Sequence, residues 1–413
     1  MDYLDLIQKQ KQNKTAVVAN GITYTYGDLA AEAQNIRGNI NKKQQYTFIY
    51  AGKIINQLIQ FLAYSGTGCV PVIATKDSKN QKFTVDDIPP TACMGVMTSG
   101  STTGKSKLFW RSYDSWADFF PVQNKIFGID GDSVIFCQGS LAFTGNLNIY
   151  LSVLSVGGAI VCTEKFLPKY WLDLIEIYKV NAMYLIPTKL MLLTRFFTGK
   201  NPTVKHIITG SQSMDRQDAF KLKRIYPQTE IILYYGASEL NYITYIKDTE
   251  MTNDRTLVGR VFPNVEIVVK NEEIFVKTPY HVEGITPPFS LKDKGYMDNK
   301  GILHFLGRKD DICNINGLKI SAGKVEQALM KVLSINEVAV TVLRKNECSI
   351  LTAFIAGEKK YSRQKIIQLL KVYLADFEIP KQFIYVKSLP KNESGKTDKL
   401  KLSKISIYRS FFF

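Results

Sequence analysis

The sequence predicts an α/β fold: a large N-terminal domain of stacked, parallel-rich sheets with helices and a small β unit, followed by a smaller C-terminal α+β domain. Strand-like and helical segments alternate up to about residue 234, as in parallel sheets joined by crossover helices. From about Gly259 the pattern changes to short strands separated by tight turns, which indicates the small β unit. A polar bridge, Gly307 to Asp311, then precedes about 100 residues with strands and helices of their own, enough for a separate domain.

The same patterns assign individual elements. Strands are expected at 22–26, 46–50, 70–74, 133–136, 159–162, 182–186, 205–209 and 230–234. Helices are expected at 27–40, 56–64, 116–126, 145–154 and 169–178, then from 188 onward and up to 225. In the small β unit, strands are expected at 265–268, 273–278 and 302–306. The last stretch places further elements at 324–332, 337–343, 350–356, 362–377 and 382–386.

Charge and composition limit the partners. The chain has 413 residues, of which 45% are hydrophobic, and a formal net charge of +16. Such a charge favours anionic partners, for example nucleotides, coenzyme A or an acidic carrier protein. Because the lysines are spread over the whole chain, small anions are favoured over nucleic acid. A source rich in lysine, isoleucine and asparagine is an alternative explanation of the charge.

Cysteine usage and apolar runs predict the compartment. Six cysteines without CxxC spacing indicate reduced, mostly buried thiols and no zinc site. The first residues lack the basic and apolar regions of a signal peptide. The most apolar run, Leu147 to Cys162, contains polar residues and is too short to span a bilayer. We therefore expect a cytoplasmic protein without an integral membrane segment.

The stretch from Thr98 to Lys107 reads TSGSTTGKSK and follows a short apolar run. Its glycines permit tight turns, and its hydroxyl, N–H and ammonium groups suit a polyanion, so a phosphate-binding loop is the first interpretation. A solvated Ser/Thr/Gly loop is the simpler alternative. A P-loop NTPase is disfavoured because its motif needs a glycine where Ser99 stands. That motif also needs a helix after the loop, whereas Leu108 begins a strand-like segment.

Two further polar, glycine-bearing loops follow predicted strands. Gly210-Ser211-Gln212 comes directly after one strand, and Tyr235 to Glu239 comes after the next. In open α/β sheets, ligands bind at the carboxyl ends of parallel strands. Three such loops in one chain therefore predict a shared binding site.

With these loops in order, the sequence resembles the adenylate-forming superfamily: acyl- and aryl-CoA ligases, luciferase, and the adenylation domains of peptide synthetases. The resemblance covers nearly the whole chain, and bacterial acyl-CoA ligases are the most similar branch. Four motifs carry it: the phosphate loop Thr98–Lys107, the Tyr-Gly-x-Thr-Glu-like Tyr235–Glu239, the hinge-like Gly307–Asp311 with Asn316–Ile320, and the Pro-x-x-x-x-Gly-Lys-like Leu389–Lys396.

The resemblance implies two half-reactions. A carboxylate attacks the α-phosphate of ATP to give an acyl-adenylate and pyrophosphate, and a thiol of coenzyme A or of a carrier protein's phosphopantetheine then displaces AMP. The implied ATP-binding residues are Thr98, Ser99, Gly100, Ser101, Thr102, Thr103, Gly104, Lys107, Gly210, Ser211, Tyr235, Gly236, Ala237, Asp293 and Arg308. In this set, the residues from 101 to 107 would hold the β- and γ-phosphates. Gly210, Ser211, Tyr235 and Gly236 would flank the adenine, and Asp293 would bind the ribose, with a further contact from Arg308.

The implied catalytic residues are Ser238, Glu239 and Lys396. Ser238 would contact the α-phosphate, and Glu239 would help to hold Mg²⁺, a hard cation suited to carboxylate oxygen. Lys396, on a mobile loop, would bridge the carboxylate and the α-phosphate. By composition alone, Glu239, Asp293 and Lys396 are compatible with solvated surface charges.

The resemblance also implies an acyl pocket and a hinge. Phe143, Thr144 and Gly145 stand where many CoA ligases carry a histidine near the acyl pocket, and no histidine or amine-pairing aspartate is present there. An unpaired buried ammonium group is costly, so an uncharged acyl or aryl tail is favoured over an amino acid. Residues 1–309 are expected to bind ATP and acid, and 310–413 to form a mobile lid with its hinge at Asp310. Gly317 and Lys319 would lie on the coenzyme A side.

The sequence therefore predicts an AMP-forming ligase that joins a carboxylic acid to coenzyme A, with ATP and Mg²⁺. The alternative is loading of an acyl, aryl or amino acid onto the phosphopantetheine of an acidic carrier protein. Departures from the family pattern are Ser101, Ser106 and Ser238, where glycine, proline and threonine are usual. A non-catalytic nucleotide sensor on the same fold is disfavoured by Glu239, Asp293 and Lys396.

Overall fold

The computed structural model describes residues 2–40, 45–50, 52–74, 88–97, 107–197, 199–309, 312–315, 318–335, 337–345, 348–391, 397–399 and 401–402. The chain divides into two compact units. The first unit contains Met1–Ser99, Ser106–Ile267 and Val276–Phe289, and the second contains Gly100–Lys105, Val268–Phe275 and Ser290–Phe413.

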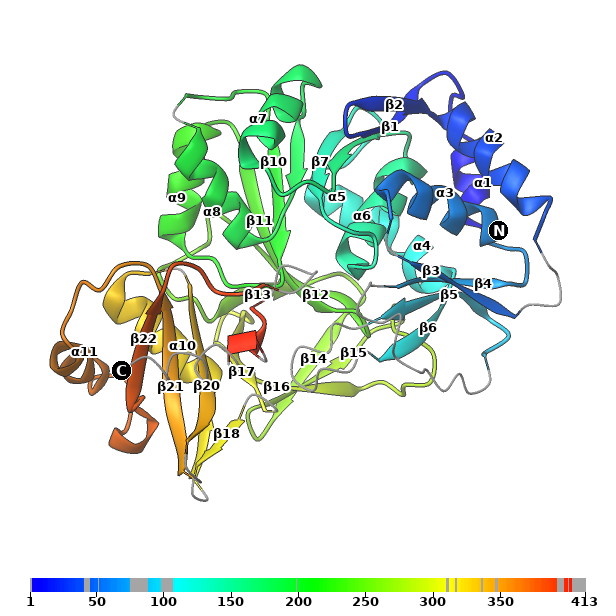
Figure 1. The fold of residues 1–413 in the computed structure, drawn as a ribbon. Helices are drawn as coiled ribbons and strands as arrows, with labels where there is room; N and C mark the ends of the chain where they lie inside the picture. Colours follow the sequence, from blue (N-terminus) through cyan, green and yellow to red (C-terminus); the bar gives the residue numbers. More distant parts are fainter. Residues whose placement is uncertain are drawn as a thin grey trace. The chain divides into compact units, whose positions relative to one another are not determined.

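A four-stranded sheet carries the ends of the predicted phosphate loop in the first unit (Figure 1). Its strands, in spatial order, are β3 (Tyr46–Tyr50), β4 (Val70–Ala74), β5 (Ala92–Met97) and β6 (Leu108–Ser112). Strands β5 and β6 are antiparallel, and Met97 pairs with Leu108. The strand predicted to begin at Leu108 is therefore confirmed. Helix α3 (Ile54–Tyr64) connects β3 to β4, which pair in parallel, and its apolar residues are buried.

The larger sheet of the first unit has a parallel centre and antiparallel margins. Its strand order is β13-β12-β11-β10-β9-β7-β8-β1-β2. The strands are β1 (Thr15–Ala19), β2 (Ile22–Thr25), β7 (Val134–Gln138), β8 (Ala159–Thr163), β9 (Ala182–Tyr184), β10 (His206–Gly210), β11 (Glu230–Ala237), β12 (Asn241–Lys247) and β13 (Leu257–Val261). Pairing is parallel from β1 through β8, β7, β9 and β10 to β11, as expected for strands joined by crossover helices.

Helices cover both faces of this sheet (Figure 1). Helices α7 (Pro168–Ile177), α8 (Pro187–Phe196) and α9 (Arg216–Ile225) bury Trp171, Leu190 and Leu222 in one core with Met183 of β9. Because side chains alternate along a strand, Tyr184 points to the opposite face. There its hydroxyl lies against the first turn of α6 (Thr144–Ser155).

The N-terminal segment adds helices α1 (Tyr3–Gln8) and α2 (Tyr26–Arg37). Helix α2 starts at the predicted place because Thr25 and Asp28 form a reciprocal capping box.

Two expectations for the first unit are corrected. The single helix predicted at 116–126 is split into α4 (Asp114–Ala117) and α5 (Phe120–Phe127), because Pro121 suits the start of a new helix and not its interior. Tyr235, Gly236 and Ala237, predicted as a loop, extend β11. Their backbone pairs with β12, which the sequence pattern did not separate from its neighbours.

The second unit contains most of a β ladder. Its strands, adjacent in this order, are β14 (Glu266–Lys270), β15 (Glu273–Lys277), β16 (Phe289–Met297) and β17 (Leu303–Arg308). After it come the hairpin β18 (Ile312–Ile315) and β19 (Leu318–Ser321), helix α10 (Ala322–Leu333), strands β20 (Val338–Lys345), β21 (Cys348–Ala356) and β22 (Gln382–Val386), helix α11 (Arg363–Leu370) and the 3₁₀ turn η2 (Asp376–Glu378).

The sheet β20-β21-β22 and the helices α10 and α11 enclose a separate apolar core that includes Val325, Leu329, Ala353 and Ile366. The sheet is mixed, because β20 and β21 pair antiparallel and β21 and β22 pair in parallel. Its combination with two helices is the α+β architecture expected for the last stretch. The single element predicted over 362–377 is divided into helix α11, which ends at Leu370, and the turn η2. Asp310, the predicted hinge, lies outside the described residues, so the boundary at 309 stays a prediction.

Among the described residues, no helix has both the length and the apolar composition that a membrane span requires. Cys69, Cys93, Cys137 and Cys162 are free thiols.

Candidate active site

Ser238 and Glu239 form a half-buried turn between β11 and β12, at the carboxyl end of the parallel sheet. Before the turn, Gly236 lets the two strands approach closely, because a Cβ at this position would lie 2.5 Å from the carbonyl oxygen of Asn241. The backbone carbonyl of Glu239 accepts a hydrogen bond of 2.9 Å from the N–H of Val282. The turn therefore has a defined backbone, which leaves the two side chains available for chemistry.

Arg111 holds the same turn from β6. Its guanidinium donates hydrogen bonds to the carbonyl oxygen of Ser238 at 2.7 Å and to that of Tyr280 at 3.2 Å. It also donates to the hydroxyl of Ser115 at 3.2 Å. Arg111 is fully buried. Burial lowers the pKa of Arg111 to about 10, while the nearby charge of Glu239 favours its protonated form, so it is cationic at neutral pH.

The first turn of α6 reaches Ser238 from the other side. The hydroxyls of Thr144 and Ser238 are hydrogen-bonded at 2.6 Å. Phe143, the N-cap of α6, offers no side-chain oxygen to the helix, and the N-terminal N–H groups of a helix favour negative charge. The predicted acyl-pocket residues Phe143, Thr144 and Gly145 thus lie beside the predicted α-phosphate residue.

Gly210 and Ser211 lie beside this turn because they end the neighbouring strand. Gly210 pairs with Tyr234 in parallel register, and Ser211 follows with a positive φ of 66° and an exposed side chain. Tyr235, Gly236 and Ala237 are half-buried on β11. Two of the three predicted loops therefore meet at one edge of the sheet, together with α6.

The third predicted loop is only partly described. Thr98, Ser99, Gly100, Ser101, Thr102, Thr103 and Gly104 lie outside the described residues. Lys107 lies directly before β6 with an exposed side chain. Their predicted role in phosphate binding stays a prediction.

Asp293 and Arg308 face each other in the second unit. They are cross-strand partners on β16 and β17, and Arg308 Nε lies 3.3 Å from Asp293 Oδ1. Asp293 is buried, whereas the side chain of Arg308 is 43% exposed. Asp310, Gly317 and Lys396 lie outside the described residues, as does the side chain of Lys319 on β19. Each of these roles also stays a prediction.

A metal site made by protein ligands alone is not visible: the described side chains include no group of three or more His, Cys, Asp or Glu that could hold an ion. Mg²⁺ is usually held by one or two carboxylates together with substrate phosphates. Glu239, half-buried in the same turn as Ser238, fits that mode of binding. Glu239 would hold Mg²⁺ there, and the ion would neutralise phosphate charge.

Sequence reasoning missed the contribution of Arg111, Tyr184 and Tyr234. Arg111 follows Leu108-Phe109-Trp110 in a strand-like run, and a single charge in such a run indicates a buried, hydrogen-bonded group. The hydroxyls of Tyr184 and Tyr234 are hydrogen-bonded at 2.5 Å behind the first turn of α6. No sequence pattern marks a pair 50 residues apart.

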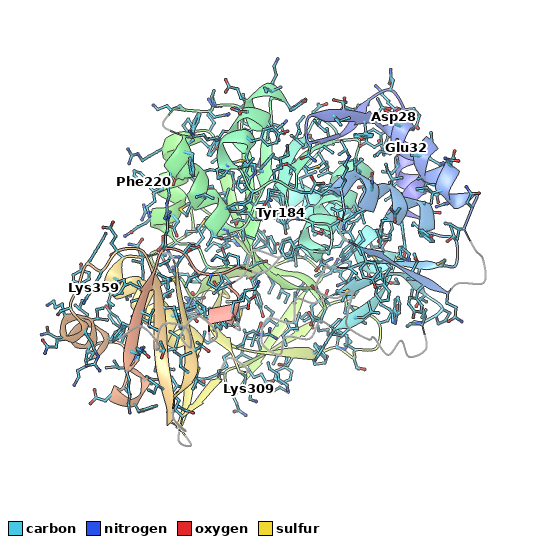
Figure 2. The ribbon with its side chains drawn as sticks, viewed as in Figure 1. Asp28, Glu32, Tyr184, Phe220, Lys309 and Lys359 are labelled. Carbon is cyan, nitrogen blue, oxygen red and sulfur yellow. The ribbon has the colours of Figure 1, made fainter. Side chains whose placement is uncertain are left out.

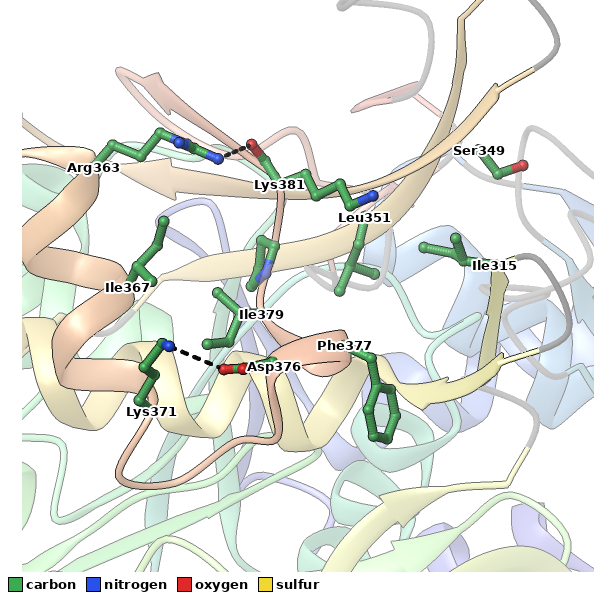
Figure 3. A pocket seen from close by; sticks show the side chains of 11 residues that line it. Ile315, Ser349, Leu351, Arg363, Ile367, Lys371, Asp376, Phe377, Ile379 and Lys381 are labelled. Atoms are coloured by element: carbon green, nitrogen blue, oxygen red, sulfur yellow. Dashed lines mark hydrogen bonds and ion pairs between the residues drawn. The ribbon is translucent and has the colours of Figure 1, made fainter.

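The second unit carries a pocket of about 230 Å³ (Figure 3). Its wall combines an apolar surface with three cationic side chains and one carboxylate: Ile315, Ser349, Leu351, Arg363, Ile367, Lys371, Asp376, Phe377, Ile379, Pro380 and Lys381. Arg363 donates to the carbonyl oxygen of Lys381 at 3.3 Å, and Lys371 pairs with Asp376 at 3.3 Å. Among these side chains positive charge prevails, so the pocket suits an anionic ligand that also has an apolar or aromatic part.

Comparison with known proteins identifies both parts of the chain. Residues 73–285 match the family model of the AMP-binding enzymes, and residues 324–396 match the model of the AMP-binding enzyme C-terminal domain.

Similar proteins include acid–thiol ligases. An uncharacterised acyl-CoA ligase of Bacillus subtilis is 29% identical over 325 residues, covering 74% of this chain and 67% of the relative. A putative long chain fatty acid-CoA ligase of Staphylococcus epidermidis is 22% identical, with 96% of each chain covered. A 3,4-dihydroxybenzoate–[aryl-carrier protein] ligase of Bacillus anthracis is 24% identical, covering 73% of this chain and 71% of the relative.

Solved structures share the fold. The o-succinylbenzoate CoA synthetase of Bacillus subtilis, in complex with its acyl-adenylate intermediate, matches with a TM-score of 0.80 at 17% identity over 97% of each chain. The ATP-bound MatB of Rhodopseudomonas palustris matches with a TM-score of 0.78 at 19% identity, over 98% of this chain and 99% of its own. The predicted fold class and the predicted family are both confirmed.

Proposed function

Because the chain belongs to the AMP-binding enzyme family and is an AMP-forming acid–thiol ligase, we propose that it activates a carboxylic acid as an acyl-adenylate and transfers the acyl group to coenzyme A. The observation that carries this proposal is the contact between the hydroxyls of Thr144 and Ser238, in the turn that also contains Glu239. This contact joins Thr144, a predicted acyl-pocket residue, to Ser238, the predicted α-phosphate residue.

In the first half-reaction, a carboxylate oxygen of the acid attacks the α-phosphorus of ATP, and pyrophosphate leaves. Such a transfer depends mainly on positioning and on neutralising charge. The Ser238 hydroxyl donates to an α-phosphate oxygen, and Thr144 orients that hydroxyl through their hydrogen bond. Arg111 keeps the backbone of Ser238 in place without contacting the nucleotide.

In the second half-reaction, the thiolate of the acceptor attacks the acyl carbon, and AMP leaves with the bridging oxygen. We place the nucleotide end of coenzyme A in the pocket of the second unit. An aromatic side chain, Phe377, suits stacking of adenine, and Arg363, Lys371 and Lys381 suit phosphate groups. The lysine–aspartate contact in the pocket is largely exposed, so its exchange for a lysine–phosphate contact costs little.

Carboxylate-dependent ATP–pyrophosphate exchange tests the first half-reaction. Wild-type protein is incubated with ATP, labelled pyrophosphate and a panel of acids, and we expect label in ATP only when an accepted acid is present. Lys396→Ala is the matched variant: exchange should fall strongly and thioester formation from a supplied acyl-adenylate much less. Absence of exchange with every acid, or equal losses of both half-reactions in Lys396→Ala, would contradict the proposal.

The identity of the acceptor is tested separately. Coenzyme A should outperform pantetheine by about tenfold in kcat/KM if its nucleotide end is bound by two or more charged groups. Lys381→Ala should reduce that advantage and leave the exchange rate unchanged. Lys359→Ala, on the exposed surface of the same unit, serves as the control.

The second candidate function is loading of an acid onto a carrier protein. The similarity to an aryl-carrier protein ligase favours it. The two functions differ in one result: active exchange without turnover of free coenzyme A, but with transfer to an acidic holo-carrier protein, would select the carrier.

A further inference from the structure

We infer that the acid activated by this enzyme is short, because two buried tyrosines close the space behind the first turn of α6. The inference rests on the proposed function, since it takes the Thr144–Ser238 contact as the place where the acid's carboxylate meets the nucleotide. It names Tyr184 and Tyr234 as residues that determine specificity.

The acid must enter past the start of α6. Its carboxylate has to reach the α-phosphate beside Ser238, whose hydroxyl is 2.6 Å from that of Thr144. The residue after Thr144 is Gly145, and behind it lies Tyr184. A Cβ on Gly145 would collide with the hydroxyl of Tyr184. The helix and the tyrosine are therefore in direct contact one residue beyond the reaction centre, and an acyl tail cannot pass between them.

Tyr234 closes the adjacent direction. It lies on β11, next to Gly210 on β10, and a Cβ on Gly210 would lie 2.5 Å from its ring. The rings of Tyr184 and Tyr234 are stacked, with centroids 6.2 Å apart and an interplanar angle of 8°. Their hydroxyls are hydrogen-bonded at 2.5 Å. The two side chains thus form one continuous wall across strands β9 and β11. Figure 2 shows Tyr184 in the interior of the first unit.

Further buried contacts hold the two tyrosine side chains in place. Tyr242 packs edge-on against Tyr234, with centroids 4.5 Å apart, and its own hydroxyl donates to Asn148 of α6 at 3.1 Å. Tyr184, Tyr234 and Tyr242 are all buried. A rotation of Tyr234 away from α6 would break the hydroxyl pair and displace Tyr242, so the wall does not open without disturbing the core.

A wall of this kind makes chain length the main determinant of specificity. In an open apolar pocket, each added CH₂ strengthens binding about fourfold. Against a closed wall an added CH₂ finds no space and has to displace packed side chains. The expected profile is an early optimum followed by a fall of about tenfold or more per added carbon.

The experiment measures affinity without requiring turnover. Acyl-sulfamoyl-adenosines, stable analogues of acyl-adenylates, are titrated into the full-length wild-type protein by calorimetry, with saturated chains of 2, 3, 4, 6, 8 and 12 carbons. We expect the tightest binding among the shortest three and at least a hundredfold weaker binding at 8 carbons. Affinity that rises steadily to 8 or 12 carbons would overturn the inference.

Variants then test whether the two tyrosines determine the accepted chain length. Tyr234→Ala, and the milder Tyr234→Leu, should shift the optimum toward longer chains, so that the ratio of the 8-carbon to the 3-carbon affinity rises at least tenfold. Tyr226→Ala removes an equally buried tyrosine from the core next to α9 and should leave that ratio unchanged. Both affinities are measured on one preparation of each variant, so an equal fraction of unfolded protein in the two titrations cancels in the ratio. An unchanged ratio in Tyr234→Leu would also overturn the inference.

The outcomes separate this inference from the proposed function. Binding of the short analogues without acid-dependent exchange would overturn the proposed adenylation and leave the size limit intact. Active exchange with long acids would do the opposite. Failure of every analogue to bind would overturn both.

Discussion

The turn at Ser238 and the pair Asp293–Arg308 are both predicted nucleotide contacts, but they are built differently. The turn is fixed by the buried Arg111 and Val282 and by the half-buried Thr144. In the pair on β16 and β17, the Asp293 carboxylate contacts an arginine side chain that is 43% exposed. A site held by buried hydrogen-bond donors is preorganised. Substitutions that remove these donors should therefore lower kcat, whereas loss of a half-exposed contact should raise the KM for ATP.

The largest effect is expected from Arg111→Met. The carbonyl oxygens of Ser238 and Tyr280 lose a charged donor, and the turn relaxes away from the position that the α-phosphate requires. We expect kcat for ATP–pyrophosphate exchange to fall about 100-fold, with little change in the KM for ATP. Arg260→Met removes a half-exposed arginine and is the control. A higher KM at unchanged kcat would show that Arg111 is not a positioning residue.

A smaller effect is expected from Gly236→Ala. The new methyl group would lie 2.5 Å from the backbone oxygen of Asn241, and backbone yields less readily than a side chain. The free energy of unfolding in urea should fall by about 2 kcal/mol. Gly38→Ala is the matched control, because its Cβ would meet nothing closer than 3.7 Å. Equal stability of the two variants would contradict close approach of β11 and β12.

Lys189 of α8 is a half-buried cation with fewer hydrogen-bond acceptors around it than Arg111. Its ammonium group donates to the carbonyl oxygen of Gln138 at 3.2 Å, and burial lowers the pKa of Lys189 to about 8. Because this pKa lies below the unfolded value, the charged group costs stability below pH 8, and the cost disappears between pH 8 and about 10.4.

Lys189→Met should therefore stabilise the protein by about 1 kcal/mol at pH 7, after allowance for partial solvation of the ammonium group. The gain should shrink as the pH rises above 8. Urea unfolding at pH 7, 8.5 and 10 measures it, with Lys169→Met on the surface of α7 as the control. A gain that is constant with pH would show that the lysine is not destabilised by burial.

The smallest effect on stability is expected from Asp293→Asn. Its ion pair with the half-exposed Arg308 contributes about 0.5 kcal/mol or less. Asparagine keeps the size of the side chain and an oxygen that accepts hydrogen bonds, so the unfolding midpoint should hardly move. If Asp293 accepts hydrogen bonds from the ribose, however, the KM for ATP should rise about tenfold at nearly constant kcat. A fall in kcat alone would instead place Asp293 with the Ser238 turn.

The sequence predicted those parts of the fold that follow from periodicity and from local signals. The capping box at Thr25 and Asp28 marks the start of α2, and the apolar strands β4, β8 and β10 lie within two residues of their predicted positions. It failed where tertiary pairing decides. Tyr235 to Ala237 are strand only because β12 lies beside them, and β12 has no turn signal that separates it from its neighbours.

The same distinction applies to the site. Ser238 and Glu239 are recognised by their motif, but the residues that position them are not. Arg111 is 127 positions from Ser238, and Thr144 is 94 positions away. Only the fold brings these groups together, because a hydrogen bond between distant strands and helices leaves no period in the sequence.

The most direct test of the Ser238 turn is ATP–pyrophosphate exchange with Ser238→Ala, measured beside the wild type at saturating ATP and acid. Loss of the α-phosphate donor should reduce kcat about 100-fold, with a KM for ATP close to that of the wild type. Exchange at the wild-type rate in a folded Ser238→Ala protein would contradict the assignment of this turn to the reaction.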